Sequence, residues 1–127
     1  MTRRREVELR LSDRKQKLYA DFMAAQLGLF MAVKNKTALK PSDSDTIARF
    51  SSNALLIASD QVIREYQEFQ RFARDHPEDL KSIRFLATLT LALRRDMGNP
   101  RTQLSAQEAM QSFIRVEDWN ELSDLFI

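Results

Sequence analysis

The stretch LATLTLALRRDMGNP, residues 86–100, decides the fold class of this chain. Its apolar run meets two arginines and an aspartate, and then glycine and proline. Arg94 and Arg95 stand where cations meet the negative end of a helix dipole, a contact that stabilises a helix by about 0.3–1 kcal/mol. Gly98 suits the left-handed position after a helix, and Pro100 stops the helix from resuming. The stretch therefore predicts an apolar helix followed by its stop signal.

The same residues also fit a second interpretation, an anion site. Two adjacent guanidinium groups bind phosphate or carboxylate well through charge-assisted hydrogen bonds. In that interpretation Asp96 orients Arg94 or Arg95. Because every residue of the stretch already has a role in ending a helix, we favour the helix end and keep the arginine pair as a candidate anion contact.

The helix that precedes this stop signal is expected to be the central one. Pro77 suits the first position of a helix, with Asp75 or His76 as its cap. The apolar residues that follow occupy more than one helical face, which is typical of a helix buried on several sides. We therefore predict a central apolar helix over about residues 78–97.

Three helices are predicted ahead of it. The first runs from about Arg4 to Lys34, with apolar residues at steps of three, four and seven. The second begins after Pro41 and has one of three residues as its N-cap, namely Ser42, Asp43 or Ser44. A break at Ala58-Ser59 separates it from a third helix that ends near Arg74.

Two shorter helices are predicted after the stop signal. Ser105 and Glu108 have the spacing of a capping box, which opens a fifth helix. The tail VEDWNELSDLFI, residues 116–127, suits a sixth helix anchored by three apolar residues, Trp119, Leu122 and Phe126. Short connections favour antiparallel neighbours. We expect an all-α, single-domain antiparallel bundle of five or six helices over residues 1–127.

Composition agrees with this fold and excludes several classes of protein. A chain of 127 residues has the size of one domain, and its two glycines and three prolines suit helices better than a sandwich or barrel. The absence of cysteine excludes a disulfide scaffold and a thiolate site. No apolar run is long enough for a membrane helix, and the N-terminus lacks the apolar core of a signal peptide. A cytoplasmic location is expected by elimination.

Charge is distributed unevenly along the chain. Residues 1–40 carry a net charge of +6, and residues 41–127 carry −4. Residues 1–17 form a basic extension of the first helix, expected to project from the domain or to pair with another chain. The basic cluster consists of Arg3, Arg4, Arg5, Arg10, Arg14, Lys15 and Lys17.

Three interpretations of this cluster remain open. It is a solvated helix end, or it contacts an acidic segment of the same fold or of a second copy, or it binds nucleic acid or an anionic membrane surface. Three acids interrupt it, and Tyr19 is the only aromatic residue nearby. No pattern for base-specific recognition accompanies the charge.

The chain offers no catalytic motif. Its glycines, Gly28 and Gly98, are too far apart for a phosphate-binding loop. One histidine, His76, forms neither a serine triad nor a two-histidine metal site. We therefore expect no catalytic residue, metal or cofactor, and place an enzyme behind an interaction protein.

Two segments share features with a known group of proteins. Residues 55–73 hold a Ser-Asp helix start before aliphatic and aromatic residues, and residues 86–108 hold the apolar helix, its stop signal and a Thr-x-Leu turn. The matching positions are Ser59, Asp60, Val62, Ile63, Arg94, Arg95, Asp96, Met97, Gly98, Asn99, Thr102 and Leu104. In these features the chain resembles a family of small bacterial helical proteins of unassigned function.

The resemblance covers about half of the chain and implies a helical fold and a bacterial setting, but no reaction. Many members of the family carry glycine before the Ser-Asp pair, where this chain has Ala58. That departure weakens the expectation of a sharp break between the second and third helices. Some members also carry a membrane segment ahead of the domain, and no such segment is expected here.

These observations together favour a non-enzymatic interaction module. Its first expected partner is a second copy of itself, reached through the long first helix, or another protein. The alternative is an accessory protein that binds nucleic acid or an anionic membrane surface through the basic cluster.

Overall fold

The computed structural model describes residues 3–77 and 79–114. Its helices are α1 (Arg3–Asn35), α2 (Pro41–Ile57), α3 (Asp60–Asp75), α4 (Ser82–Asp96) and α5 (Ala106–Phe113). No strand occurs among the described residues, which confirms the predicted all-α class. The predicted tail helix lies outside these residues.

Contacts within the chain divide it into two compact units, Met1–Ala58 and Ser59–Ile127, and each is described by itself. The expectation of a single domain stays a prediction. Within the described residues, no helix combines the length and apolarity needed to cross a membrane.

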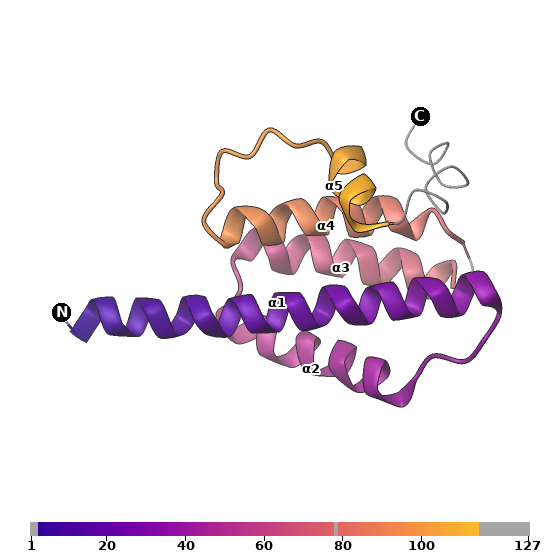
Figure 1. The fold of residues 1–127 in the computed structure, drawn as a ribbon, viewed down its shortest axis with the longest axis horizontal. Helices are drawn as coiled ribbons and strands as arrows, with labels where there is room; N and C mark the ends of the chain where they lie inside the picture. The colour runs from indigo at the N-terminus through magenta and orange to yellow at the C-terminus, as the bar shows by residue number, and fades with distance from the viewer. Residues whose placement is uncertain (1–2, 78, 115–127) are drawn as a thin grey trace. The chain divides into compact units, whose positions relative to one another are not determined.

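The first unit is an antiparallel pair of helices, α1 and α2 (Figure 1). The chain leaves α1 through Lys36, whose φ of 54° is left-handed, and Thr37 donates its N–H to the Ala32 carbonyl at 2.9 Å. Two aromatic rings then join the helices. Phe22 and Phe50 are fully buried and stack with their centroids 3.9 Å apart.

The start of α2 differs from the prediction. Neither Ser42, Asp43 nor Ser44 is the N-cap. The cap is Lys40, whose side chain makes no capping hydrogen bond, and Pro41 is the first helical residue. Proline has φ already set for a helix and lacks the N–H that a first residue would leave unpaired. The helix therefore begins two to four residues earlier than the predicted caps would place it.

The break between α2 and α3 occurs at the predicted place. Ala58 has extended backbone angles, and Ser59 caps α3 by accepting the Val62 N–H at 3.3 Å. Serine is a preferred N-cap because its hydroxyl satisfies one of the free N–H groups of the first turn. Ala58 therefore suffices at this break, and no glycine is needed before the Ser-Asp pair.

The second unit contains α3, α4 and α5, and α4 packs against both of the others (Figure 1). Seven of its residues are buried: Ile83, Leu86, Ala87, Leu89, Leu91, Ala92 and Leu93. Phe72 of α3 stacks on Phe85 of α4 with centroids 4.7 Å apart. This burial on several sides confirms α4 as the central helix of its unit.

The start of α4 corrects the predicted start near residue 78. The helix begins at Ser82, and Pro77 lies in the turn before it. His76 ends α3 instead of opening α4, because its N–H bonds the Phe72 carbonyl at 2.8 Å. The Asp79 carboxylate accepts the Lys81 N–H at 2.9 Å, and such Asx turns compete with helical hydrogen bonding.

The start of α5 matches the capping box predicted from its sequence. Ser105 Oγ accepts the Glu108 N–H, and Glu108 Oε1 accepts the Ser105 N–H, both at 3.0 Å. Two donors of the first turn are satisfied by these reciprocal bonds.

Candidate functional site: the basic end of α1 and the cleft beside it

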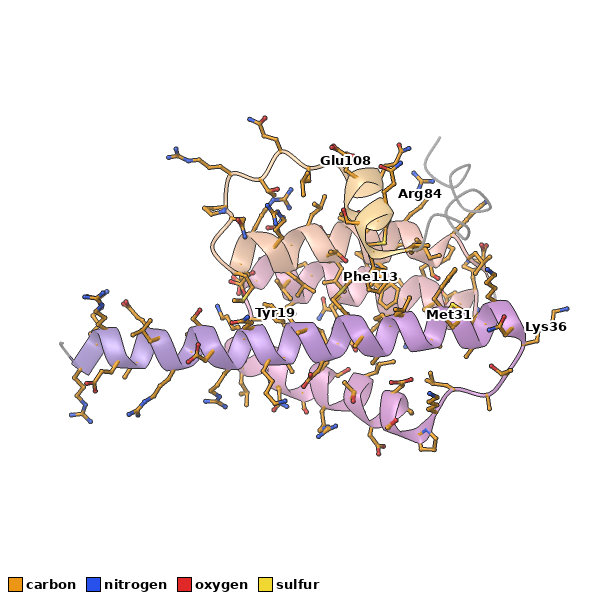
Figure 2. All side chains as sticks on the ribbon, in the orientation of Figure 1. Tyr19, Met31, Lys36, Arg84, Glu108 and Phe113 are labelled. Atoms are coloured by element: carbon orange, nitrogen blue, oxygen red, sulfur yellow. The ribbon has the colours of Figure 1, made fainter. Side chains whose placement is uncertain are left out.

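The first third of α1 stands in solvent. Every residue from Arg3 to Arg14 is exposed, and the first buried residue of the helix is Tyr19. Figure 2 shows side chains standing out from this segment on all sides. At 33 residues α1 is about 50 Å long. With 17 residues, α2 is about half that length, so it pairs with only the later part of α1.

The predicted basic cluster is thereby divided. Arg3, Arg4, Arg5 and Arg10 lie wholly on the exposed segment, whereas Arg14 and Lys17 reach a cleft shared with α2. Lys15 is partly buried. The Arg4 guanidinium pairs with Glu8 at 3.3 Å, one turn along the helix. Because both side chains are mostly exposed, this pair contributes little to stability.

Apolar side chains accompany these charges. Val7 is 56% exposed, Leu9 49% and Leu11 36%. Val7 and Leu11 are four residues apart and therefore share a helical face, which continues the apolar stripe of the paired part of α1. The exposed segment thus has an apolar strip with charged borders.

The cleft beside this segment lies between α1 and α2, within the first unit. Its volume is about 260 Å³. Four residues of each helix line it: Arg14, Lys17, Leu18 and Asp21 of α1, and Thr46, Arg49, Asn53 and Ile57 of α2. We call this the α1–α2 cleft. Three cations and one acid give its lining a positive charge.

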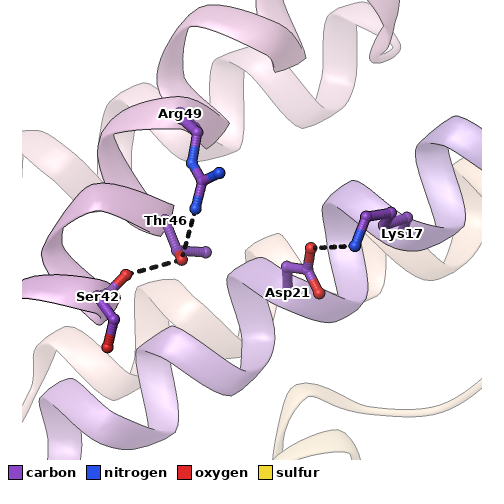
Figure 3. A network of polar contacts seen from close by, with 5 residues as sticks. All are labelled: Lys17, Asp21, Ser42, Thr46 and Arg49. Atoms are coloured by element: carbon purple, nitrogen blue, oxygen red, sulfur yellow. Dashed lines mark hydrogen bonds and ion pairs between the residues drawn. The ribbon is translucent and has the colours of Figure 1, made fainter.

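Figure 3 shows the polar contacts along the walls of the cleft. Lys17 Nζ lies 3.2 Å from Asp21 Oδ2 on the same helix. On α2, Arg49 Nη2 donates to Thr46 Oγ1 at 3.4 Å, and the Thr46 hydroxyl donates to the Ser42 carbonyl at 2.9 Å. The Lys17–Asp21 pair and the Arg49–Thr46–Ser42 contacts each stay within one helix. Their cations line the cleft from opposite helices.

The other end of the helix pair is packed closely at Gly28. A Cβ atom at this position would overlap the carboxylate of Asp43, in the first turn of α2. Glycine therefore leaves room on α1 for the Asp43 carboxylate, which lies in the first turn of α2, where the helix dipole stabilises an acid. The roles of Gly28 and Arg49 have no signature in the sequence, because both depend on how α2 is aligned with α1.

Arg94 and Arg95 lie at the end of α4, as the stop signal predicts. Gly98 has a φ of 104°, and its N–H donates to the Arg95 carbonyl at 3.3 Å. The Asn99 N–H donates to the Arg94 carbonyl at 3.2 Å. These two bonds define a Schellman motif, which satisfies the last free carbonyls of a helix.

Side chains around this motif hold the following turn. Arg94 Nε donates to Thr102 Oγ1 at 3.0 Å, and Asn99 Nδ2 donates to the Arg94 carbonyl at 3.2 Å. Asp96 Oδ2 accepts the Ser59 N–H at 3.3 Å, which ties the end of α4 to the start of α3. Asp96 thus also holds the residue that caps α3, and its expected role in orienting Arg94 or Arg95 stays a prediction.

A second cleft lies within the second unit, with a volume of about 510 Å³. Its lining comes from Arg84, Phe85 and Thr88 of α4 and from Ser105, Ala106 and Gln107 at the start of α5. Figure 2 labels Arg84 of α4, which lines this cleft, and Glu108 of α5, which belongs to the capping box. The capping box already occupies two donors at this helix start, which leaves it less suited to an anion.

Within residues 3–77 and 79–114, no group of three or more His, Asp or Glu side chains has the arrangement of a metal site. Comparison with known proteins gives no further assignment, because no family model, curated protein or solved structure matches the chain. The resemblance to small bacterial helical proteins accordingly stays a prediction.

Proposed function

We propose that this chain is a non-enzymatic interaction module that associates with a second copy through the exposed first third of α1. The observation that carries the proposal is that every residue of a helical segment, Arg3 to Arg14, is exposed, including Val7, Leu9 and Leu11. A helical segment with charged residues alone would remain in water. The apolar strip of this segment is instead a surface that a partner protein can bury.

Charge complementarity supports a second copy as the partner. The net charge of residues 1–40 is +6 and that of residues 41–127 is −4, so the basic helix of one copy attracts the acidic part of another. A parallel contact between two basic segments would instead place like charges together. We therefore expect the exposed segment of each copy to meet the acidic part of its partner.

The expected association is weak. Val7 is 56% exposed and Leu11 is 36% exposed, so burying the remaining surface of each side chain contributes about 1 kcal/mol. Two copies of each side chain reach about 4 kcal/mol, which corresponds to millimolar affinity before the cost of association is met. Opposite charges must supply the remainder, and the association should therefore weaken as salt is added.

Light scattering over a concentration series at low and high salt tests this proposal. We expect the mean mass to rise toward a dimer at concentrations up to about 1 mM at low salt. The double variant Val7→Gln/Leu11→Gln should remain monomeric. A constant monomer mass for the unmodified chain would refute the proposal.

The matched control uses another exposed apolar pair. Leu55 and Leu56, at the end of α2, are 70% and 80% exposed. Leu55→Gln/Leu56→Gln removes more exposed apolar surface than the α1 variant, and we expect it to associate normally. Loss of association in this control alone would assign the interface to α2 and contradict the role of α1.

Nucleic acid and anionic membranes are less well suited to the same segment. Glu6, Glu8 and Asp13 lie among its cations, and Arg4 is paired with Glu8. Polyanion binding needs several cations free to contact phosphates together. Tight low-salt binding of DNA or anionic vesicles that is lost in Arg3→Gln/Arg10→Gln would overturn the choice of a second copy.

A further inference from the structure

We propose that the α1–α2 cleft binds a phosphate group through Arg14, Lys17 and Arg49. The proposal is independent of the association described above, which concerns the segment of α1 ahead of the cleft. It rests on three cations that line this one cleft from two helices.

The chemistry of the lining suits a phosphate. Guanidinium groups donate paired hydrogen bonds to phosphate oxygens, and lysine adds a mobile positive charge. Arg14 and Lys17 approach from α1, and Arg49 approaches from α2. A tetrahedral anion has oxygens to offer both walls, whereas a flat carboxylate offers two in one plane. Asn53 adds an amide donor to the same lining.

The cations are held only loosely by their present contacts. Lys17 and Asp21 form an exposed pair, with side chains 80% and 53% accessible, and such pairs contribute little. The bond from Arg49 to Thr46, at 3.4 Å, is long for a hydrogen bond. Arg14 forms no hydrogen bond or ion pair with any other residue that the structure describes. All three can therefore turn toward an anion at small cost.

The size of the cleft sets the class of ligand. Its volume of about 260 Å³ lies just below the roughly 300–1,000 Å³ of cavities for drug-sized ligands. Since a water molecule occupies about 30 Å³, the cleft holds a phosphate with a few waters or with a small organic group. Leu18 and Ile57 give that organic group an apolar contact. The chemistry therefore points to inorganic phosphate or a small phosphomonoester.

Titration of the full chain with inorganic phosphate, followed by two-dimensional amide NMR, tests the site. Ionic strength is held constant with chloride, so that screening does not change during the titration. We expect saturable shifts at Thr46 and Arg49. The double variant Arg14→Gln/Arg49→Gln should weaken binding by about tenfold or more, because two charge-assisted contacts are lost.

The control is Arg10→Gln. Arg10 lies one turn ahead of Arg14 on the same side of α1 but does not line the cleft, so Arg10→Gln removes one positive charge, as the single variant Arg14→Gln does, without touching the site. We expect its phosphate affinity to stay within about twofold of the parent chain. Equal weakening in Arg10→Gln and Arg14→Gln, or shifts that never saturate, would overturn the proposal.

Two further arms identify the source of the phosphate and guard against misfolding. Glycerol phosphate that binds more tightly than inorganic phosphate supports a phosphomonoester, and equal binding supports the inorganic ion. Arg49→Lys keeps the charge and removes the paired geometry, so it should give an intermediate affinity. Circular dichroism checks that each variant keeps the helix content of the parent chain. If the phosphate affinity is then unchanged in both Arg49→Lys and Arg14→Gln/Arg49→Gln, the result contradicts the site.

Discussion

Replacing Gly28 by alanine has two opposing effects on the free energy of unfolding: a gain in helix propensity and a steric overlap with Asp43. Alanine favours a helix interior over glycine by about 0.5–1 kcal/mol. Its Cβ would, however, overlap the Asp43 carboxylate, so either this side chain or α2 must move. The structure therefore predicts that the effect of Gly28→Ala depends on the residue at position 43.

The magnitudes decide the sign. Inserting a methyl group into a closely packed contact costs about 1–3 kcal/mol. Displacing Asp43 also weakens its interaction with the dipole of α2, which contributes about 0.3–1 kcal/mol for an acid in the first turn of a helix. Gly28→Ala should therefore destabilise the chain by about 1 kcal/mol with Asp43 present, and stabilise it by up to about 1 kcal/mol with Asp43→Ala. The coupling energy should be about 1–3 kcal/mol.

Urea unfolding followed by circular dichroism measures the four proteins of this cycle. Ala24→Gly, at an exposed position of the same helix, supplies the propensity difference without a packing contact. Additive effects, with coupling below about 0.5 kcal/mol, would mean that the approach of α1 to α2 at Gly28 carries no packing energy. That result would refute the assignment of Gly28 as the close contact of the pair.

Two other predictions concern helix ends. Gly98→Ala should destabilise the chain by about 1–3 kcal/mol through backbone strain alone, since a Cβ there meets no atom within 4 Å. Asparagine tolerates a positive φ better than alanine, so Gly98→Asn should cost less in the same urea assay. Equal costs for the two variants would contradict backbone strain as the cause. Ser105→Ala removes the cap of α5 and should lower the free energy of local opening of this helix by about 0.5–2 kcal/mol, measured as faster amide hydrogen exchange. Unchanged exchange at the Ala109 amide would argue against the capping box.

The helix ends that were predicted well are closed by local bonds. Ser59 accepts from Val62, Ser105 exchanges bonds with Glu108, and Gly98 ends α4 through residues at most five positions away. Both partners of each bond are neighbours in the sequence, so residue type and spacing determine the outcome. No knowledge of tertiary packing is needed for these features.

The two errors both concern proline. Pro41 takes the first position of α2 itself, and the side chains expected to cap the helix lie inside it. Pro77 follows the end of α3 instead of opening α4. Proline is common both at the first position of a helix and just after a helix ends, so its presence marks a boundary without saying which one. At Pro77 the Asx turn of Asp79 delays the next helix.

The α1–α2 cleft could not be predicted from the sequence, for a different reason. Its cations come from positions more than thirty residues apart, and only the alignment of α1 with α2 brings Arg49 opposite Arg14 and Lys17. That alignment depends on the Phe22–Phe50 stack and on the contact at Gly28. Neither has a signature in spacing or composition, because each half of the contact looks like an ordinary helical residue.

The basic cluster, a single group in the sequence, thus forms two surfaces in the folded chain. Ahead of Arg14 the cations border an apolar strip in open solvent, where screening leaves each of them a small effect on association. From Arg14 onward they share a cleft with Arg49, where several contacts to one anion act together. Neutralising Arg10 should therefore alter the salt dependence of self-association and leave phosphate affinity unchanged, whereas neutralising Arg49 should do the reverse. A single surface would make both variants change both measurements together.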